Sequence, residues 1–123
     1  MDVLGYAILM LIAGLVIYGR FAPVKGLRNL EAARFREESR GGRVVDVREP
    51  FEYRRGHIPG AVNIPLGQLR SRISEIPNDV PVFLYCHSGM RSRQAGRILL
   101  RHGYRQVAHL KGGMAAWDGP LAK

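Results

Sequence analysis

Cysteine is almost absent from this chain of 123 residues, whose only thiol belongs to Cys86. A single cysteine excludes a disulfide within the chain and is typical of a protein in a reducing compartment. Zinc-ligand spacing is missing too, because His102 and His109 have no second type of ligand at a suitable distance along the sequence. We therefore expect no disulfide framework and no metal site.

Acidic residues are also scarce. The chain has 10 Asp and Glu residues against 19 Lys and Arg residues, and its formal net charge of +9 is spread from Arg20 to Lys123. Such a surface attracts anions of many kinds. The sequence has no basic heptad helix and no aromatic stacking motif, so no nucleic-acid partner is predicted. The length fits one compact domain, and two independent catalytic domains would not fit.

Charge is missing altogether from residues 3–19, which as a helix would reach about 25 Å at ~1.5 Å per residue, the short end of a bilayer span. We predict a transmembrane anchor over residues 1–20, because the rest of the chain could scarcely cover a helix that is apolar on all sides. A cleaved signal peptide is the alternative, but Asp2 stands where such a peptide carries positive charge. The basic residues follow the run, from Arg20 to Arg28, so the positive-inside rule predicts a single-pass protein whose body lies in the cytoplasm.

The rest of the chain alternates between strand and helix patterns. After a linker over residues 21–29, we predict one domain over residues 30–121. β-branched and apolar runs predict strands, whereas apolar residues at helical spacing between Pro or Gly boundaries predict helices. The predicted strands are 43–47, 61–65, 80–85 and 106–110, and the predicted helices lie within 29–42, 50–56, 66–77 and 91–102, with a last one that starts at 112. This alternation predicts an α/β fold with a mainly parallel sheet and helices on both faces.

Cys86 directly follows the most apolar of the predicted strands. In an open parallel sheet ligands bind beyond the carboxyl ends of the strands, so this position makes Cys86 a candidate site residue. Gly89 permits a tight turn into a helix whose first N–H groups and positive dipole end can converge on one point. Together with Arg91, this arrangement favours the thiolate, the nucleophilic form of cysteine. A buried, inert thiol is the alternative, but it would leave the glycine and the arginines unexplained.

Three motifs, in this order along the chain, resemble those of the rhodanese family. They are "VVDVREPFEYRRGHIPGAVNIPL", "CHSGMRS" and "LKGGMAAW", and the resemblance covers roughly residues 30–121. It implies a rhodanese-like sheet and a sulfurtransferase that needs no cofactor. Cys86 would take sulfane sulfur from an anionic donor such as thiosulfate, hold it as a persulfide and deliver it to an external thiol or to cyanide. The resemblance also implies a substrate-binding cradle around the persulfide, formed by His87, Ser88, Gly89, Met90, Arg91 and Ser92.

Two alternative functions are kept open. Phosphatases of the cell-cycle type share this general fold, but they place five residues between Cys and Arg, whereas four separate Cys86 from Arg91. No acidic residue in the loop is an obvious proton donor for a phosphate leaving group. The second alternative is a non-catalytic binding or scaffold module at the membrane, and the intact cysteine argues against it.

Residues outside the loop are expected mainly to support the fold. Asp46 and Arg48 face the same way along their strand, so we expect a paired network beneath the site. His57 is expected to be a hydrogen-bonded structural residue rather than a general base, and Trp117 a core anchor. Three arginines spaced four residues apart predict a solvated helix face, with an anionic partner as the alternative: Arg93, Arg97 and Arg101.

Overall fold

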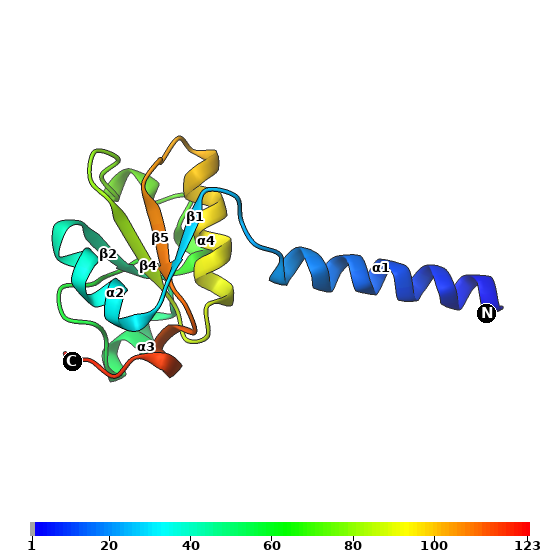
Figure 1. Cartoon of the computed structure of the whole chain (residues 1–123), viewed down its shortest axis with the longest axis horizontal. Helices are drawn as coiled ribbons and strands as arrows, with labels where there is room; N and C mark the ends of the chain where they lie inside the picture. The colour runs from blue at the N-terminus through cyan, green and yellow to red at the C-terminus, as the bar shows by residue number, and fades with distance from the viewer. Residues whose placement is uncertain (1) are drawn as a thin grey trace.

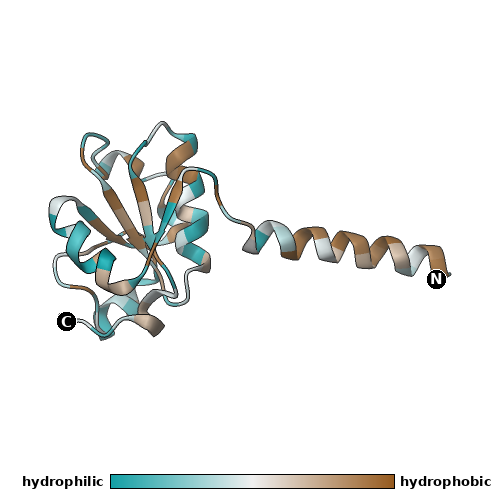
Figure 2. Cartoon of the chain, in the orientation of Figure 1, coloured by the Kyte–Doolittle hydropathy of each residue, from teal (hydrophilic) through white to brown (hydrophobic). Residues whose placement is uncertain are grey.

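The computed structural model describes residues 2–123; Met1, the first residue of the predicted anchor, lies outside the described residues. Helix α1 (Val3–Phe21) projects away from an α/β domain that contains the rest of the chain (Figure 1). Apolar residues follow one another along most of this helix (Figure 2), and they are exposed in the structure. The helix is long enough and apolar enough to cross a membrane.

The domain is built on one five-stranded sheet in which every strand pairing is parallel. The strand order is β1-β5-β4-β2-β3, with β4 in the middle. The strands are β1 (Leu27–Leu30), β2 (Arg43–Asp46), β3 (Val62–Asn63), β4 (Val82–Tyr85) and β5 (Val107–Leu110). Because parallel strands point the same way, their carboxyl ends all lie at one edge of the sheet. The predicted α/β fold with a mainly parallel sheet is confirmed.

Helices cover both faces of this sheet, as the alternating pattern predicts. On one face, α4 (Met90–Arg101) buries Leu99 against the apolar side chains of the central strands. On the other face, α2 (Ala32–Glu38) buries Phe35, whose ring meets the edge of Phe83 at 5.7 Å between centroids. Both contacts fill the interior at positions where truncation to alanine typically costs about 2–5 kcal/mol. The sheet is therefore held rigidly between helices on its two faces.

Strand β1 corrects the predicted domain boundary. Residues 21–29 were expected to be a linker, and Leu30 to belong to a helix, but the sheet begins at Leu27. The sequence "LRNL" has no alternating pattern that would predict a strand. It becomes one because its backbone pairs with β5, where Leu27 aligns with Val107, eighty positions further along the chain. The fold thus extends three residues further toward the N-terminus than predicted.

Two predicted helices are shorter than expected. In place of a helix over residues 66–77, the chain makes two 3₁₀ turns, Leu66–Gln68 and Ile73–Glu75. The hydroxyl of Tyr104 lies 2.6 Å from the carbonyl oxygen of Ile76 and 3.0 Å from that of Ile73, so it can donate to either carbonyl at the end of this segment. Similarly, the predicted terminal helix is the single 3₁₀ turn Gly113–Ala116, which follows a glycine in the left-handed conformation.

The remaining predicted elements differ only in length. The helix expected over residues 91–102 is α4, one residue displaced, and the short helix opened by proline is α3 (Pro50–Arg55). A capping box closes the start of α3. The side chain of Glu49 accepts from the backbone N–H of Glu52, and the side chain of Glu52 accepts from the backbone N–H of Glu49. The strand predicted over residues 61–65 is reduced to the two residues of β3, at the edge of the sheet.

Candidate active site

Backbone N–H groups converge on the sulfur of Cys86 at the carboxyl edge of the sheet. Cys86 follows β4 directly and is 1% exposed. The backbone N–H of Gly89 points to its Sγ at 3.1 Å, and that of Ser92 does so at 3.3 Å. Gly89 adopts a φ of 102°, which permits the tight turn, and no side chain caps the first turn of α4. The loop therefore offers its amide donors to the sulfur, an arrangement that suits a negative charge there.

Ser92 and His109 form a polar layer behind the sulfur. The Ser92 hydroxyl lies 3.6 Å from Cys86 Sγ and 2.8 Å from Nδ1 of His109, and it also reaches the carbonyl of Gly89 at 3.2 Å. Both side chains are buried. Burial, helped by the positive charge of Arg93, lowers the pKa of His109 to about 4, so its imidazole is neutral near pH 7. The sequence analysis missed this contact, although a histidine in the apolar run "QVAHL" already calls for a buried polar partner.

Two glycines after β5 let the chain pass directly over the start of the loop. The N–H of Met114 donates to the carbonyl of Cys86 at 2.9 Å, and that of Ala115 donates to the carbonyl of His87 at 3.1 Å. A side chain at Gly113 would place its Cβ 2.4 Å from the His87 oxygen. Gly113 is therefore required by this close approach, which fixes the backbone of the loop.

The predicted pairing of Asp46 and Arg48 is present beneath the site. The two side chains are almost fully buried, with Arg48 Nη2 2.7 Å from Asp46 Oδ2. The guanidinium also donates to the carbonyl of Gly56 at 2.8 Å and lies over the ring of Tyr85, the last residue of β4. The hydroxyl of Tyr85 in turn accepts a hydrogen bond from the N–H of Ile58. This network ties the "GHIPGA" segment to the strand that carries Cys86.

Arg91 makes an ion pair that the sequence analysis did not anticipate. Its guanidinium makes a bidentate pair with Glu52 on α3, with Nη1 2.7 Å from Oε1 and Nη2 3.1 Å from Oε2. These hydrogen bonds lower the pKa of the Glu52 carboxyl from 4.5 to about 2, so the pair is charged near neutral pH. The two residues are 39 positions apart, and only the fold brings them together. The anion-binding role of Arg91 stays a prediction.

The other predicted site residues lie around this centre. His87 and Ser88 are exposed at the mouth of the loop, and Met90 is half-buried at the start of α4. His57 is a hydrogen-bonded structural residue as predicted: its Nδ1 lies 2.9 Å from the carbonyl of Tyr53, on whose ring it stacks. Trp117 packs partly buried against the apolar cluster on the α2 face.

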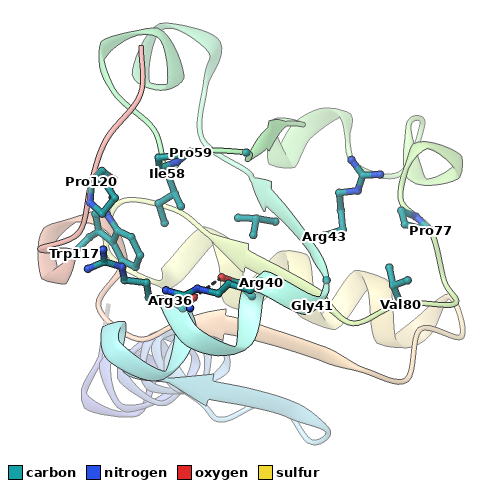
Figure 3. Close-up of a pocket in the computed structure, with 14 residues that line it drawn as sticks. Arg36, Arg40, Gly41, Arg43, Ile58, Pro59, Pro77, Val80, Trp117 and Pro120 are labelled. Atoms are coloured by element: carbon teal, nitrogen blue, oxygen red, sulfur yellow. Dashed lines mark hydrogen bonds between the residues drawn. The ribbon is translucent and has the colours of Figure 1, made fainter.

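A separate cavity lies along the face of the sheet that α2 covers. It has a volume of about 710 Å³ and is lined by residues from α2, the start of β2 and the segment around Trp117 (Figure 3). None of residues 86–92 lines it. Arg36, Arg40 and Arg43 reach it, but it contains no cysteine and no acid or base suited to nucleophilic chemistry. We therefore assign the candidate active site by the groups around Cys86 rather than by volume.

Comparison with known proteins gives the class of this fold and site. The family model described as "Rhodanese-like domain" matches residues 30–119, and the chain belongs to this family. It is 39% identical over 117 residues to the uncharacterized protein YqhL of Bacillus subtilis, covering 93% of each chain. It is 32% identical to the thiosulfate sulfurtransferase GlpE of Pseudoalteromonas translucida, over 65% of this chain and 76% of that protein. The crystal structure of a rhodanese-related protein from Thermoplasma volcanium matches with a TM-score of 0.73 and 32% identity, covering 77% of this chain and 97% of that one.

Proposed function

We propose that this protein is a membrane-anchored sulfurtransferase that carries sulfane sulfur on Cys86. The observation that carries the proposal is the convergence of the Gly89 and Ser92 N–H groups on the Cys86 sulfur, at 3.1 and 3.3 Å. Family membership and a relative named thiosulfate sulfurtransferase support the same reaction class. We propose thiosulfate, or a similar sulfane-sulfur anion, as the donor.

The proposed reaction is a double displacement. The Cys86 thiolate attacks the outer sulfur of thiosulfate, the sulfur–sulfur bond of the donor breaks, and sulfite leaves with the electron pair. Cys86 then holds the transferred atom as a persulfide. In the second step an acceptor thiolate attacks the outer sulfur of the persulfide, and the Cys86 thiolate is the leaving group. Cyanide would accept the same sulfur as thiocyanate, and because the chain has no second cysteine the acceptor thiol comes from another molecule.

The loop supplies the electrostatics of both steps. Fixed N–H dipoles need no reorganisation when negative charge moves from the thiolate to the persulfide, so they stabilise both states of the carrier. His87 and Ser88, exposed at the mouth, are placed to meet the incoming anion. Arg91 provides positive charge beside the entrance, although it shares that charge with Glu52. No cofactor takes part in this mechanism.

The anchor is the second part of the proposal. We propose that α1 crosses the membrane once and that the domain lies on the cytoplasmic side, because the basic residues that follow the apolar run favour that side. A membrane-impermeant thiol reagent applied to intact cells should leave Cys86 unmodified, and it should react after the cells are opened. Modification of Cys86 in intact cells would overturn the cytoplasmic orientation.

The reaction is tested by the mass of the protein itself. After incubation with thiosulfate, the wild-type chain should gain the mass of one sulfur atom and lose it again on treatment with cyanide. Cys86→Ser should gain nothing, whereas Ser71→Ala, a small change at an exposed position outside the loop, should still be loaded. A wild-type chain that never gains the sulfur would instead favour the non-catalytic scaffold module.

A further inference from the structure

Two arginines of α4 contact the end of α1, although they are more than seventy residues away in the sequence. Arg93 Nη1 lies 3.4 Å from the carbonyl of Arg20, and Arg97 Nη2 lies 3.3 Å from the carbonyl of Gly19. The last carbonyls of a helix have no partner within it and form its negative end, so guanidinium groups are favourable there. Figure 1 shows α4 on the side of the domain from which α1 projects, lying across the end of that helix. The outer side of α4 is thus next to the point where α1 leaves the domain.

The surface at this junction is strongly basic. We call it the α4 basic face, and it consists of Arg93, Arg97 and Arg101 on α4 together with Arg20 and Lys25 on the chain that leaves α1. Each of these residues is exposed or half-buried. None of them takes part in the ion pairs formed within residues 2–123. Five cations therefore lie at this junction, and none of them forms an ion pair with a carboxylate of the described residues.

We infer that the α4 basic face binds anionic phospholipid headgroups on the surface of the membrane that α1 crosses. The inference rests on the proposed membrane span. A helix that lies across the end of a transmembrane helix runs along the membrane surface, within the roughly 8 Å over which charges act at physiological salt. Basic residues near an anionic leaflet each add about 1 kcal/mol of attraction, so several of them can hold a domain that is already tethered there.

Docking in this orientation would also fix the position of the active site relative to the membrane. Helix α4 begins in the Cys86 loop, at Met90, so the loop is rigidly connected to the docked surface. Cys86 would then lie at a fixed distance from the membrane surface, where it would meet the sulfur donor or the sulfur acceptor. A domain that only swings on its tether would present the loop at many heights and angles.

The experiment measures how fast arginine side chains react with phenylglyoxal in the full chain, reconstituted into nanodiscs. One set of discs contains phosphatidylcholine alone, and the other contains phosphatidylcholine with phosphatidylglycerol. Modification of Arg97 and Arg101, quantified by mass spectrometry, should be roughly five-fold slower in the anionic discs. The internal controls are Arg36 on α2 and Arg40 in the 3₁₀ turn that follows it, both exposed on the other face of the sheet, and they should react equally in both kinds of disc. Added salt should remove the protection.

A pair of charge-matched variants tests the surface itself. In R97E/R101E, Arg93 should react equally fast in the two kinds of disc, whereas in R36E/R40E its protection in anionic discs should persist. Wild-type reactivity that is the same in both lipids, in a chain that vesicles retain during alkaline carbonate extraction, would overturn the docking and leave the membrane span standing. A chain that carbonate extracts from the vesicles would overturn both.

Discussion

The two edges of the sheet are both basic, yet only one is arranged for chemistry. At the carboxyl edge, Cys86 is buried, two N–H groups point at its sulfur, and a buried ion pair supports the loop. On the α2 face, a cavity of about 710 Å³ reaches the amino edge, where Arg40 and Arg43 line it, but it contains no cysteine. Positive charge and volume are therefore insufficient to define the site. What separates the two edges is the convergence of fixed donors on one atom.

The two ends of strand β2 give the largest expected contrast in stability. Asp46 at the carboxyl end is fully buried with Arg48, so Asp46→Ala leaves a buried guanidinium without its partner. We expect the free energy of unfolding to fall by roughly 3–5 kcal/mol. Arg43→Ala, at the exposed end beside the cavity, should change it by less than about 0.5 kcal/mol. Denaturant titration of both variants in mild detergent measures the difference, and equal losses would contradict the role of the buried pair.

The polar layer behind Cys86 should make stability depend on pH. His109 has a pKa of about 4 in the folded state, below the 6.5 of an unperturbed histidine, so the unfolded chain binds the proton more readily. Stability should therefore be constant above about pH 6.5 and fall by up to about 3 kcal/mol as the pH drops toward 4.

His109→Gln isolates this effect. The difference in unfolding free energy between pH 7 and pH 5 should become smaller in His109→Gln than in the wild type. His102→Gln, a surface change at the far end of α4, should leave this difference between pH 7 and pH 5 unchanged. If His109→Gln retained the full pH dependence, the fall in stability would have to come from other groups.

Two glycines with positive φ, one at each edge of the sheet, allow the cost of an unfavourable backbone conformation to be measured apart from the cost of a steric clash. Gly113 has a φ of 61° and Gly60 has a φ of 84°, so alanine at either position costs about 1–2 kcal/mol. A Cβ at Gly113 would also meet the backbone oxygens of Cys86 and His87 at 2.5 and 2.4 Å, whereas a Cβ at Gly60 meets nothing within 4 Å.

Gly113→Ala should therefore lose about 1–3 kcal/mol more than Gly60→Ala. It should also slow the loading of sulfur, because the loop backbone must shift. Thermal unfolding together with the rate of mass gain in thiosulfate tests both effects. Normal loading by a destabilised Gly113→Ala would mean that the clamp stabilises the fold without setting the geometry of the loop.

The local parts of this comparison could be predicted from the sequence. The apolar run before Cys86, the glycine turn after it and the alternation of Asp46 and Arg48 depend on neighbouring residues, and the structure places each as expected. Strand β1 could not be predicted, because its only strand partner is the distant β5 and its four residues have no strand pattern. Contacts between distant side chains were missed for the same reason.

The ion pair at the entrance is the clearest of these missed contacts. Arg91 was expected to bind an anion, and only the structure shows that Glu52 of α3 also pairs with it. A comparable pair outside the site is Arg28 with Glu38, which joins β1 to α2 and is also made by two hydrogen bonds. Comparing variants of the two pairs measures how a carboxylate beside the active site affects the binding of thiosulfate.

Glu52→Gln should strengthen the binding of thiosulfate slightly. With a pKa of about 2, Glu52 is ionised throughout the neutral range, repels an anionic donor and occupies the Arg91 guanidinium. Removing its charge should lower the KM for thiosulfate by roughly two- to five-fold, the size expected for a partly exposed ion pair. Glu38→Gln, which breaks a similar pair far from Cys86, should leave KM unchanged. A raised KM in Glu52→Gln would instead mean that Glu52 orients Arg91 for the donor, so the direction of this change decides between the two roles.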